Sequence, residues 1–286
     1  MKSRLFSLTL LYLIILVFLV RGSIQVFSDI DSTGLEFPYQ DKFIQDSKGR
    51  LHIVFEDSGE DLQQATSTDN GSTWSSTEIL TGTSYIHPSL AVDSNNGLYV
   101  VLVDGGPNNI IYINSSNQST WSSPAIIAST NNLDLPSIAI GPSNELRVCY
   151  IDLTQGDLMY IGSDNLGLNW SGAVVNTSAQ DRCDIEVDST GMIHIVAQSD
   201  GPDTVYHFNS SNGVNWSTTL IDDGTNHRNP SIAIGNNDQT YVAWGENTAS
   251  SKIWFANSSD KGKSWTTRSI QVNTTSTLND ALYANI

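Results

Sequence analysis

The chain has 286 residues, of which 13 are lysine or arginine and 30 are aspartate or glutamate, so its formal net charge at pH 7 is −17. Nucleic-acid binding needs clustered basic side chains that neutralise phosphates, so this charge argues against a nucleic-acid partner. The same sign argues against adsorption of the folded part to an anionic membrane surface. The length allows one large domain or two ordinary ones.

The N-terminus has the pattern of an export signal. Lys2 and Arg4 precede an apolar run over residues 5–20, which is long for a secretory signal and short for a membrane-spanning helix. We predict that residues 1–22 are a cleaved signal peptide or, less favoured, a retained membrane anchor, and that residues 23–286 form the folded domain. Nine Asn-x-Ser/Thr sequons suit a secreted or cell-surface glycoprotein.

One acidic segment follows the signal. Asp29, Asp31 and Gly34 resemble the start of a calcium loop, but the twelfth position, which needs an acidic ligand, is Gln40. A polar turn is the favoured interpretation. The five histidines show no HExxH-like spacing. We therefore predict no metal site and no cofactor.

A repeat of about 48 residues runs through the rest of the chain. Five of the seven tryptophans recur at steps of 47, 49, 46 and 49 residues, and these are Trp74, Trp121, Trp170, Trp216 and Trp265. The segments HPSLAVD, LPSIAIG, RCDIEVD and NPSIAIG recur at steps of 48, 47 and 47 residues. Periods of 40 to 50 residues indicate a propeller or a helical array.

The content of each repeat favours the propeller. Short β-branched and aromatic runs at residues 51–57, 98–104, 146–152, 193–199 and 240–246 are bounded by turn sequences. No window after the signal shows a helical apolar stripe. We predict an all-β propeller of four-stranded blades, with five complete repeats at residues 39–85, 86–133, 134–180, 181–227 and 228–277 and a partial sixth at 278–286.

The number of blades depends on the two ends of the domain. The sequence SIQV at residues 23–26 returns at residues 269–272, where the fourth strand of the fifth repeat is expected. The N-terminal segment then resembles an outer strand, and residues 278–286 resemble an inner one. A six-bladed ring with a truncated last blade is the favoured prediction, and a tightly closed five-bladed ring is the alternative.

The stretch STDNGSTW at residues 67–74 joins the third and fourth predicted strands of the first repeat. Gly71 can adopt the positive φ of a hairpin turn, and Asp69 and Ser67 can accept hydrogen bonds from the turn's own backbone. Trp74 can bury its ring between neighbouring sheets. The weaker copies tolerate Asn for Asp, or Gln118 for glycine. These turns are therefore predicted to stabilise the fold rather than to catalyse.

The pattern Ser/Thr-x-Asp-x-Gly-x-x-Trp resembles the Asp-box, or bacterial neuraminidase (BNR) repeat, of the sialidase-like propeller superfamily. The resemblance covers residues 40–286, and it implies that the boxes lie on the side of the propeller away from the ligand. The residues that carry it are Ser67, Asp69, Gly71, Trp74, Ser163, Gly167, Trp170, Gly213, Trp216, Ser258, Asp260, Gly262 and Trp265.

The opposite side is the predicted ligand-binding face. Acidic residues end the second strand of each repeat, and further polar residues precede each first strand. The candidates are His87, Asp104, Asp134, Asp152, Arg182, Asp200, Arg228 and Glu246. The alternative interpretation is that these are solvated loops, because strand ends are commonly polar.

The resemblance to sialidases also implies a catalytic set, namely three arginines that clamp a carboxylate, a tyrosine paired with a glutamate, and an aspartate acid/base. The first arginine belongs to an Arg-Ile-Pro motif in the first blade, where this chain has YQDKF. Arg182 and Arg228 are the candidate pair, and a third arginine is missing. Tyr283 is a possible nucleophile without a partner. We assign no catalytic residue.

We therefore predict an exported, non-catalytic module that binds an extracellular glycan or protein, touching a membrane only through an uncleaved N-terminus. The alternatives are an exo-sialidase-type glycoside hydrolase and a structural surface-layer or adhesion domain. The two cysteines, Cys149 and Cys183, fall on adjacent blades. One disulfide and two buried thiols are both compatible with the sequence.

Overall fold

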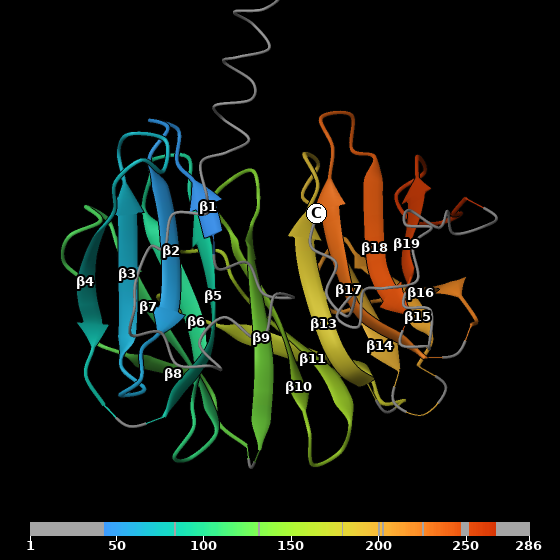
Figure 1. Ribbon diagram of the computed structural model, residues 1–286. Coiled ribbons are helices and arrows are strands. Elements are labelled where there is room, and N and C mark those ends of the chain that lie inside the picture. The colour runs from blue at the N-terminus through green and yellow to red at the C-terminus, as the bar shows by residue number, and fades with distance from the viewer. Residues whose placement is uncertain are drawn as a thin grey trace, which may run out of the picture.

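The computed structural model describes residues 43–266, apart from residues 83, 131, 179, 200, 202, 225 and 247–251. Every regular element in this part of the chain is a β-strand, and the strands form five antiparallel sheets in chain order (Figure 1). Four sheets have four strands and the fifth has three. The fourth strand predicted for the fifth repeat lies beyond residue 266, outside the described residues.

The first sheet contains β1 (Phe43–Gln45), β2 (Leu51–Glu56), β3 (Leu62–Ser67) and β4 (Ser75–Leu80), and the second β5 (Tyr85–Val92), β6 (Leu98–Asp104), β7 (Asn109–Ser115) and β8 (Ala125–Ala128). The third contains β9 (Leu133–Ile140), β10 (Leu146–Asp152), β11 (Asp157–Ser163) and β12 (Ser171–Asn176), and the fourth β13 (Gln180–Val187), β14 (Ile193–Ser199), β15 (Val205–Ser210) and β16 (Ser217–Asp222). The fifth contains β17 (His227–Ile234), β18 (Thr240–Glu246) and β19 (Lys252–Ser258).

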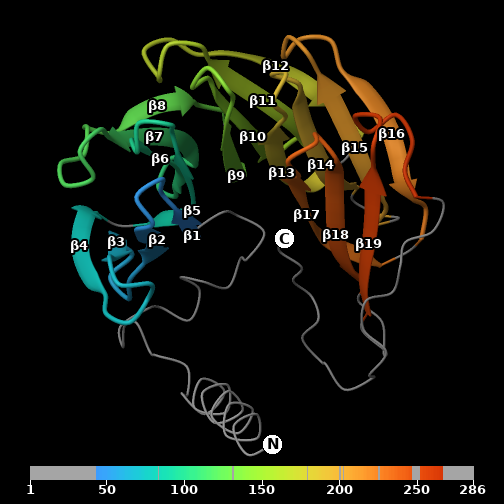
Figure 2. The same ribbon diagram turned by 90° about the horizontal axis from the view of Figure 1, so that it is seen from above.

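The sheets follow one another around a common centre, as Figure 2 shows. The first strands β5, β9, β13 and β17 pack against one another on the inside, and the last strands β4, β8, β12 and β16 lie outside. This arrangement confirms the all-β propeller. The segments that bear on the signal or anchor (1–22), the acidic turn (29–40) and the sixth blade (23–27 and 278–286) lie outside the described residues. Within those residues no helix is long and apolar enough to span a membrane.

The core lies between consecutive sheets rather than within one of them. Strand β6 (LYVVLVD) is buried at every position except Asp104, because both of its faces meet neighbouring sheets. One cluster joins Val101 and Tyr112 of the second sheet to Val148 and Tyr150 of the third. Equivalent clusters fill the other three interfaces. Burial of these side chains stabilises each interface by about 25 cal/mol per Å² of apolar surface.

Hydrogen bonds link the inner strands near the centre. The backbone N–H of Ile138 donates to Oγ of Ser89 on the preceding sheet, at 3.2 Å. On the fourth sheet, Asp184 occupies the position that serine holds elsewhere. Its Oδ1 accepts from Oγ of Ser137 at 2.8 Å, and its Oδ2 accepts from the backbone N–H of Ile232 at 2.9 Å. Asp184 therefore connects three consecutive sheets.

Burial raises the pKa of Asp184 to about 6, even though its hydrogen bonds oppose the shift. The folded state then holds this proton more tightly than the unfolded state does. The resulting stabilisation is fully present below the ordinary pKa of about 3.8 and is lost as the pH rises through about 6. We expect wild type to gain stability relative to Asp184→Asn as the pH falls from 7 to 4. Melting temperatures of both proteins across this range test the prediction, and a constant or reversed difference would contradict it.

The turns between the third and fourth strands, here called tryptophan turns, hold themselves together as predicted. In residues 67–74, Oγ of Ser67 accepts from the N–H of Gly71 at 2.9 Å, and Oδ1 of Asp69 accepts from the N–H of Thr73 at 2.8 Å. The Trp74 indole N–H donates to the carbonyl of Gly71 at 3.1 Å. The same three bonds recur in residues 163–170 and 258–265.

Two tryptophan turns are one residue shorter. In each sheet, the serine that begins the turn pairs with the first residue of the second strand. These pairs are Leu51 with Ser67 in the first sheet, Leu98 with Ser115 in the second and Ile193 with Ser210 in the fourth. These short turns therefore span residues 115–121 and 210–216, and Asn117 and Asn212 replace the aspartate as acceptors of backbone N–H groups.

The tryptophan turns also join neighbouring sheets. The rings of Trp170, Trp216 and Trp265 lie edge-on to Tyr112, Tyr160 and His207 of the preceding sheet, with centroids 5.2, 5.2 and 5.1 Å apart. A Cβ atom on Gly167, Gly213 or Gly262 would overlap the same three rings. The glycines are needed for this close approach as well as for their positive φ. Trp74 makes no such ring contact among the described residues.

Candidate functional site

One side of the propeller is formed by the turns after β2, β6, β10 and β14 together with the starts of the next inner strands. Backbone bonds tie these parts across each interface, from Tyr85 to Glu60, Leu133 to Asn108, Gln180 to Gly156 and His227 to Asp203. We call this side the mouth face. The tryptophan turns are at the opposite ends of the strands, on what we call the turn face (Figure 1). The mouth face carries those of the ligand-binding residues predicted from the sequence that the structure describes.

Three inner strands have a strained residue on the mouth face. His87, Leu135 and Asn229 have φ of 55°, 54° and 53°, within β5, β9 and β17, and each precedes a proline. The other left-handed residues that are not glycine, among those described, lie in turns and loops. Such residues cost roughly 1–3 kcal/mol each and gather at functional sites. At all three positions the pairing between the first and second strands of the sheet shifts register, which marks a β-bulge. The bulge is therefore a recurring feature of the inner strands.

Side chains bridge the interfaces beside these bulges. The backbone N–H of His87 donates to Oε1 of Glu56 at 2.6 Å, and that of Asn229 donates to Oε1 of Gln198 at 3.1 Å. Glu56 and Gln198 hold equivalent positions at the ends of β2 and β14. Nδ1 of His87 also lies 2.5 Å from Oδ1 of Asp134 on the next sheet. Glu56, His87 and Asp134 thus form a polar chain across three sheets.

The two arginines of the mouth face are ion-paired with aspartates. Nε of Arg182 lies 3.8 Å from Asp181, and a terminal nitrogen of Arg228 lies 3.5 Å from Asp203 of the preceding sheet. The other two described arginines belong to the turn face, where Arg50 pairs with Asp46 and Arg147 pairs with Asp164, both at 2.7 Å. Among the described residues, the mouth face therefore offers two arginines, each with its charge compensated.

The remaining residues that the sequence predicts for the ligand-binding face have different surroundings. Oε2 of Glu246 accepts the indole N–H of Trp254 at 2.7 Å and lies 3.3 Å from Nζ of Lys252, at the edge of the mouth face. Oδ1 of Asp152 accepts from the backbone N–H of Thr154 and so holds its own turn. Asp104 ends β6 and pairs with Asn109 in the ladder. Asp200 lies outside the described residues.

Sequence reasoning missed Glu56 and Gln198. A signal was present, because the equivalent residues at the ends of the other second strands are Val103, Ile151 and Gly245. A polar residue in a position that is otherwise apolar indicates a specific partner. Among the described residues, no group of three or more His, Cys, Asp or Glu side chains is placed to hold a metal ion.

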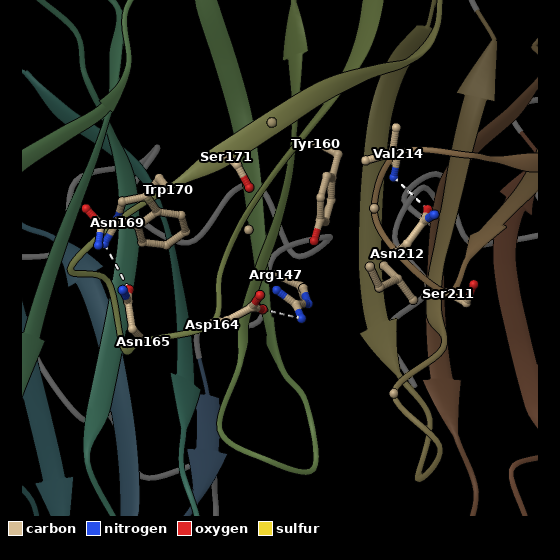
Figure 3. A pocket seen from close by; sticks show the side chains of 15 residues that line it. Arg147, Tyr160, Asp164, Asn165, Asn169, Trp170, Ser171, Ser211, Asn212 and Val214 are labelled. Atoms are coloured by element: carbon tan, nitrogen blue, oxygen red, sulfur yellow. Dashed lines mark hydrogen bonds and ion pairs between the residues drawn. The ribbon is translucent and has the colours of Figure 1, made fainter.

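A cavity of about 520 Å³ opens on the turn face, between the third and fourth sheets (Figure 3). Arg147, Asp164 and Tyr160 point into it from the third sheet, and Asn212 and Val214 line it from the fourth. The sequence analysis did not predict it, and it lies on the side of the propeller opposite to the predicted ligand face.

No protein-family model matches the sequence, and no curated protein matches it. Solved structures do match the fold. An ulvan lyase of a new polysaccharide lyase family superposes with a TM-score of 0.63 at 14% identity, covering 87% of this chain and 72% of that one. The intramolecular trans-sialidase from Ruminococcus gnavus gives 0.62 at 12% identity, with 89% of each chain covered.

The chain has the fold of the sialidase propellers. The NanB sialidase from Streptococcus pneumoniae also matches, with a TM-score of 0.59 and 12% identity, over 87% of this chain and 63% of that one. Identities this low establish the fold alone. Function has to be argued from the residues on the mouth and turn faces.

Proposed function

We propose that this sialidase-like propeller is a non-catalytic module that binds an extracellular carbohydrate at its mouth face. The observation that carries the proposal is the set of three left-handed residues, His87, Leu135 and Asn229, on inner strands that meet at this face. Backbone strain of this kind is retained where the surrounding structure holds it for a purpose. The printed descriptions of the fold neighbours name a polysaccharide lyase and sialidases, which supports a carbohydrate ligand.

The hydrogen bonds of the tryptophan turns support their assignment as Asp-boxes, with two short variants at residues 115–121 and 210–216. Secretion or display at the cell surface is part of the same proposal. The disulfide between Cys149 and Cys183, whose Cα atoms are 6.4 Å apart, supports it, because disulfides persist in oxidising compartments.

The arginine pairs support binding without hydrolysis. A clamp on a sialic acid carboxylate needs guanidinium groups with donors directed at the substrate. Asp181 and Asp203 compensate the charges of Arg182 and Arg228 within 4 Å, so an incoming carboxylate would compete with two resident ones. This arrangement suits the hydroxyl groups of a sugar better than a second carboxylate.

Purified protein is expected to release no sialic acid from a fluorogenic sialoside above the rate in buffer. The reason is the compensated arginine pair and the absence of an arginine in YQDKF at the start of the first repeat. Release of free sialic acid that Arg228→Ala abolishes would establish the hydrolase alternative instead.

Carbohydrate binding itself is tested by screening wild type against acidic and neutral oligosaccharides and titrating the best ligand. We expect Arg228→Met and Asp134→Asn each to weaken binding by roughly tenfold, since each loses a charged hydrogen-bonding group on the mouth face. Asp69→Asn, on the turn face, is the control and should bind as wild type does, because asparagine holds this position in three other turns. Unchanged affinity in both mouth-face variants would contradict the proposal.

A further inference from the structure

The interface that contains the cavity lacks a hydrogen-bonded link that recurs at the other interfaces. The turns between the first and second strands, here called inner turns, are bonded to one another at the other interfaces. Ser47 donates to Asn96, Ser94 to Asn144 and Ser189 to Asp238, through both the backbone N–H and the hydroxyl group. At the interface of the third and fourth sheets, the equivalent residues are Pro142 and Gly191. Proline lacks the N–H donor, and glycine lacks the acceptor.

A second contact, from a tryptophan turn to the inner turn of the preceding sheet, occurs at two interfaces and is absent from this one. Gln118 reaches Asp46 of the preceding sheet at 3.1 Å, and Lys261 reaches Asp188 of the preceding sheet at 3.0 Å. Gly141 occupies the position of those aspartates in the third sheet. The carboxylate of Glu145 lies beside Gly141 and accepts from the backbone N–H of Ser143. Among the described residues, however, no hydrogen bond joins the tryptophan turn of the fourth sheet to this inner turn.

The loss of that aspartate redirects Arg147. The equivalent residues His52, Tyr99 and His194 each contact the aspartate of their own inner turn. Because Gly141 offers no carboxylate, Arg147 pairs with Asp164 of the tryptophan turn, at 2.7 Å. Its Nε is buried and has no hydrogen-bond partner among the described residues. A terminal nitrogen of Arg147 and the carboxylate of Asp164, whose side chain is 80% exposed, thus lie side by side in the lining of the cavity.

One side chain that lines the cavity, Val214, is apolar at a position where the first, second and fifth tryptophan turns are polar. Two residues before the tryptophan, the third and fourth tryptophan turns carry Leu168 and Val214, which are 82% and 66% exposed. The other three turns carry Ser72, Ser119 and Lys263 at this position. The exposed apolar side chain of Val214 beside polar lining residues indicates contact with a ligand that has both polar and apolar faces.

We propose that this cavity is a second carbohydrate site, separate from the mouth face, that binds a neutral sugar with adjacent hydroxyl groups. The Arg147–Asp164 pair presents a donor and an acceptor side by side, which complements two neighbouring hydroxyls. Its charges cancel, and the chain carries a net charge of −17, so an anionic sugar gains nothing there. The volume of about 520 Å³ is within the usual range for small-molecule sites, about 300–1,000 Å³.

The two walls of this site are held together by a covalent bond. Cys149 on β10 and Cys183 on β13 form a disulfide between the third and fourth sheets. The space can stay open without the inner-turn link because the disulfide fixes the distance between the sheets. A preformed site costs less to occupy than one that must open.

The test is a titration followed by NMR of isotope-labelled protein. The probes are D-galactose, D-mannose and L-fucose as neutral sugars, and D-glucuronic acid and N-acetylneuraminic acid as anionic ones. The protein is made in a host that adds no N-glycans, because Asn169 lies at the rim within an Asn-Trp-Ser sequon. We expect saturable shifts of the Trp170 indole and Gly191 amide signals with at least one neutral sugar, and none with the anionic sugars.

The decisive variant closes the cavity with the link that the other interfaces use. Gly191 has φ of +83°, and a Cβ there meets nothing within 4 Å, while Asn96 and Asn144 hold the equivalent position with positive φ. Pro142→Ser with Gly191→Asn should therefore fold, restore the link and weaken sugar binding roughly tenfold or more. Arg147→Met should weaken it to a similar extent. Gly49→Asn, at the equivalent glycine of the first inner turn, is the matched control and should bind as wild type does, because Gly49 also has positive φ and an added Cβ would lie 3.9 Å from its nearest neighbour, Nε2 of Gln45.

Three results would overturn the proposal. They are the absence of saturable binding by every neutral sugar, unchanged binding in the closed variant, and a preference of the cavity for the anionic sugars. Shifts confined to mouth-face signals, such as His87 and Asn229, would likewise overturn it while supporting the first proposal. Shifts of cavity signals without shifts of mouth-face signals would support the cavity site and contradict binding at the mouth face. The two proposals can therefore fail independently of each other.

Discussion

Replacing Trp265 by alanine is expected to lower the free energy of unfolding by about 3 kcal/mol, whereas replacing Trp74 is expected to cost about 1 kcal/mol. Both tryptophans end complete turns with the same three internal hydrogen bonds. They differ in what lies beyond the turn. Trp265 lies edge-on to His207 and packs against the core between the fourth and fifth sheets, and Trp74 has no such ring partner among the described residues.

The comparison isolates the contribution of the inter-sheet contact, because the turn itself is matched. Urea unfolding of wild type and the two variants measures it. Asp69→Ala is expected to destabilise the turn without affecting ligand binding at the mouth face. Equal costs for Trp74 and Trp265 would show that the tryptophans act only within their own turns. Loss of mouth-face binding at full stability would refute the structural role of the turns.

Reducing the disulfide is expected to lower the free energy of unfolding by about 3–4 kcal/mol. Cys149 and Cys183 are 34 residues apart in sequence, and both side chains are almost fully buried. The bond closes a loop of this length in the unfolded chain and so removes much of its conformational entropy. Unfolding of the oxidised and the reduced wild type by urea measures the difference.

The double variant Cys149→Ala/Cys183→Ala separates the bond from the reductant. Its stability should be close to that of the reduced wild type and should not change when reductant is added. Mass spectrometry of the native protein gives a direct check. Two thiols that react with an alkylating agent without prior reduction would show that the bond does not form.

The propeller could be predicted because its signals are local and repeated. The tryptophan period, the short apolar runs and the turn sequences each report on one strand or one hairpin, and five copies reinforce one another. Contacts between sheets could not be predicted in the same way. The glycines at 167, 213 and 262 were assigned to turn geometry alone, since the rings that approach them belong to the preceding repeat.

The same limit applies to the two faces. His87, Leu135 and Asn229 precede prolines in the sequence, yet their left-handed backbone depends on the ladder shift that follows. On the turn face, Pro142 and Gly191 read as ordinary turn residues. The missing hydrogen bonds between them can be recognised only by comparison with the Ser47–Asn96 link at the interface of the first and second sheets.

The exchange of a hydrogen-bonded link for a covalent one has a consequence for how the molecule comes apart. In an array of repeats, each unit is stabilised mainly by its neighbours, so the weakest interface decides whether the array unfolds as one body. The interface of the third and fourth sheets lacks the inner-turn link, and it carries the disulfide instead. With the disulfide formed, we expect the third and fourth sheets to unfold together. After reduction, we expect this interface to contribute less to holding the sheets together than it does in the oxidised protein.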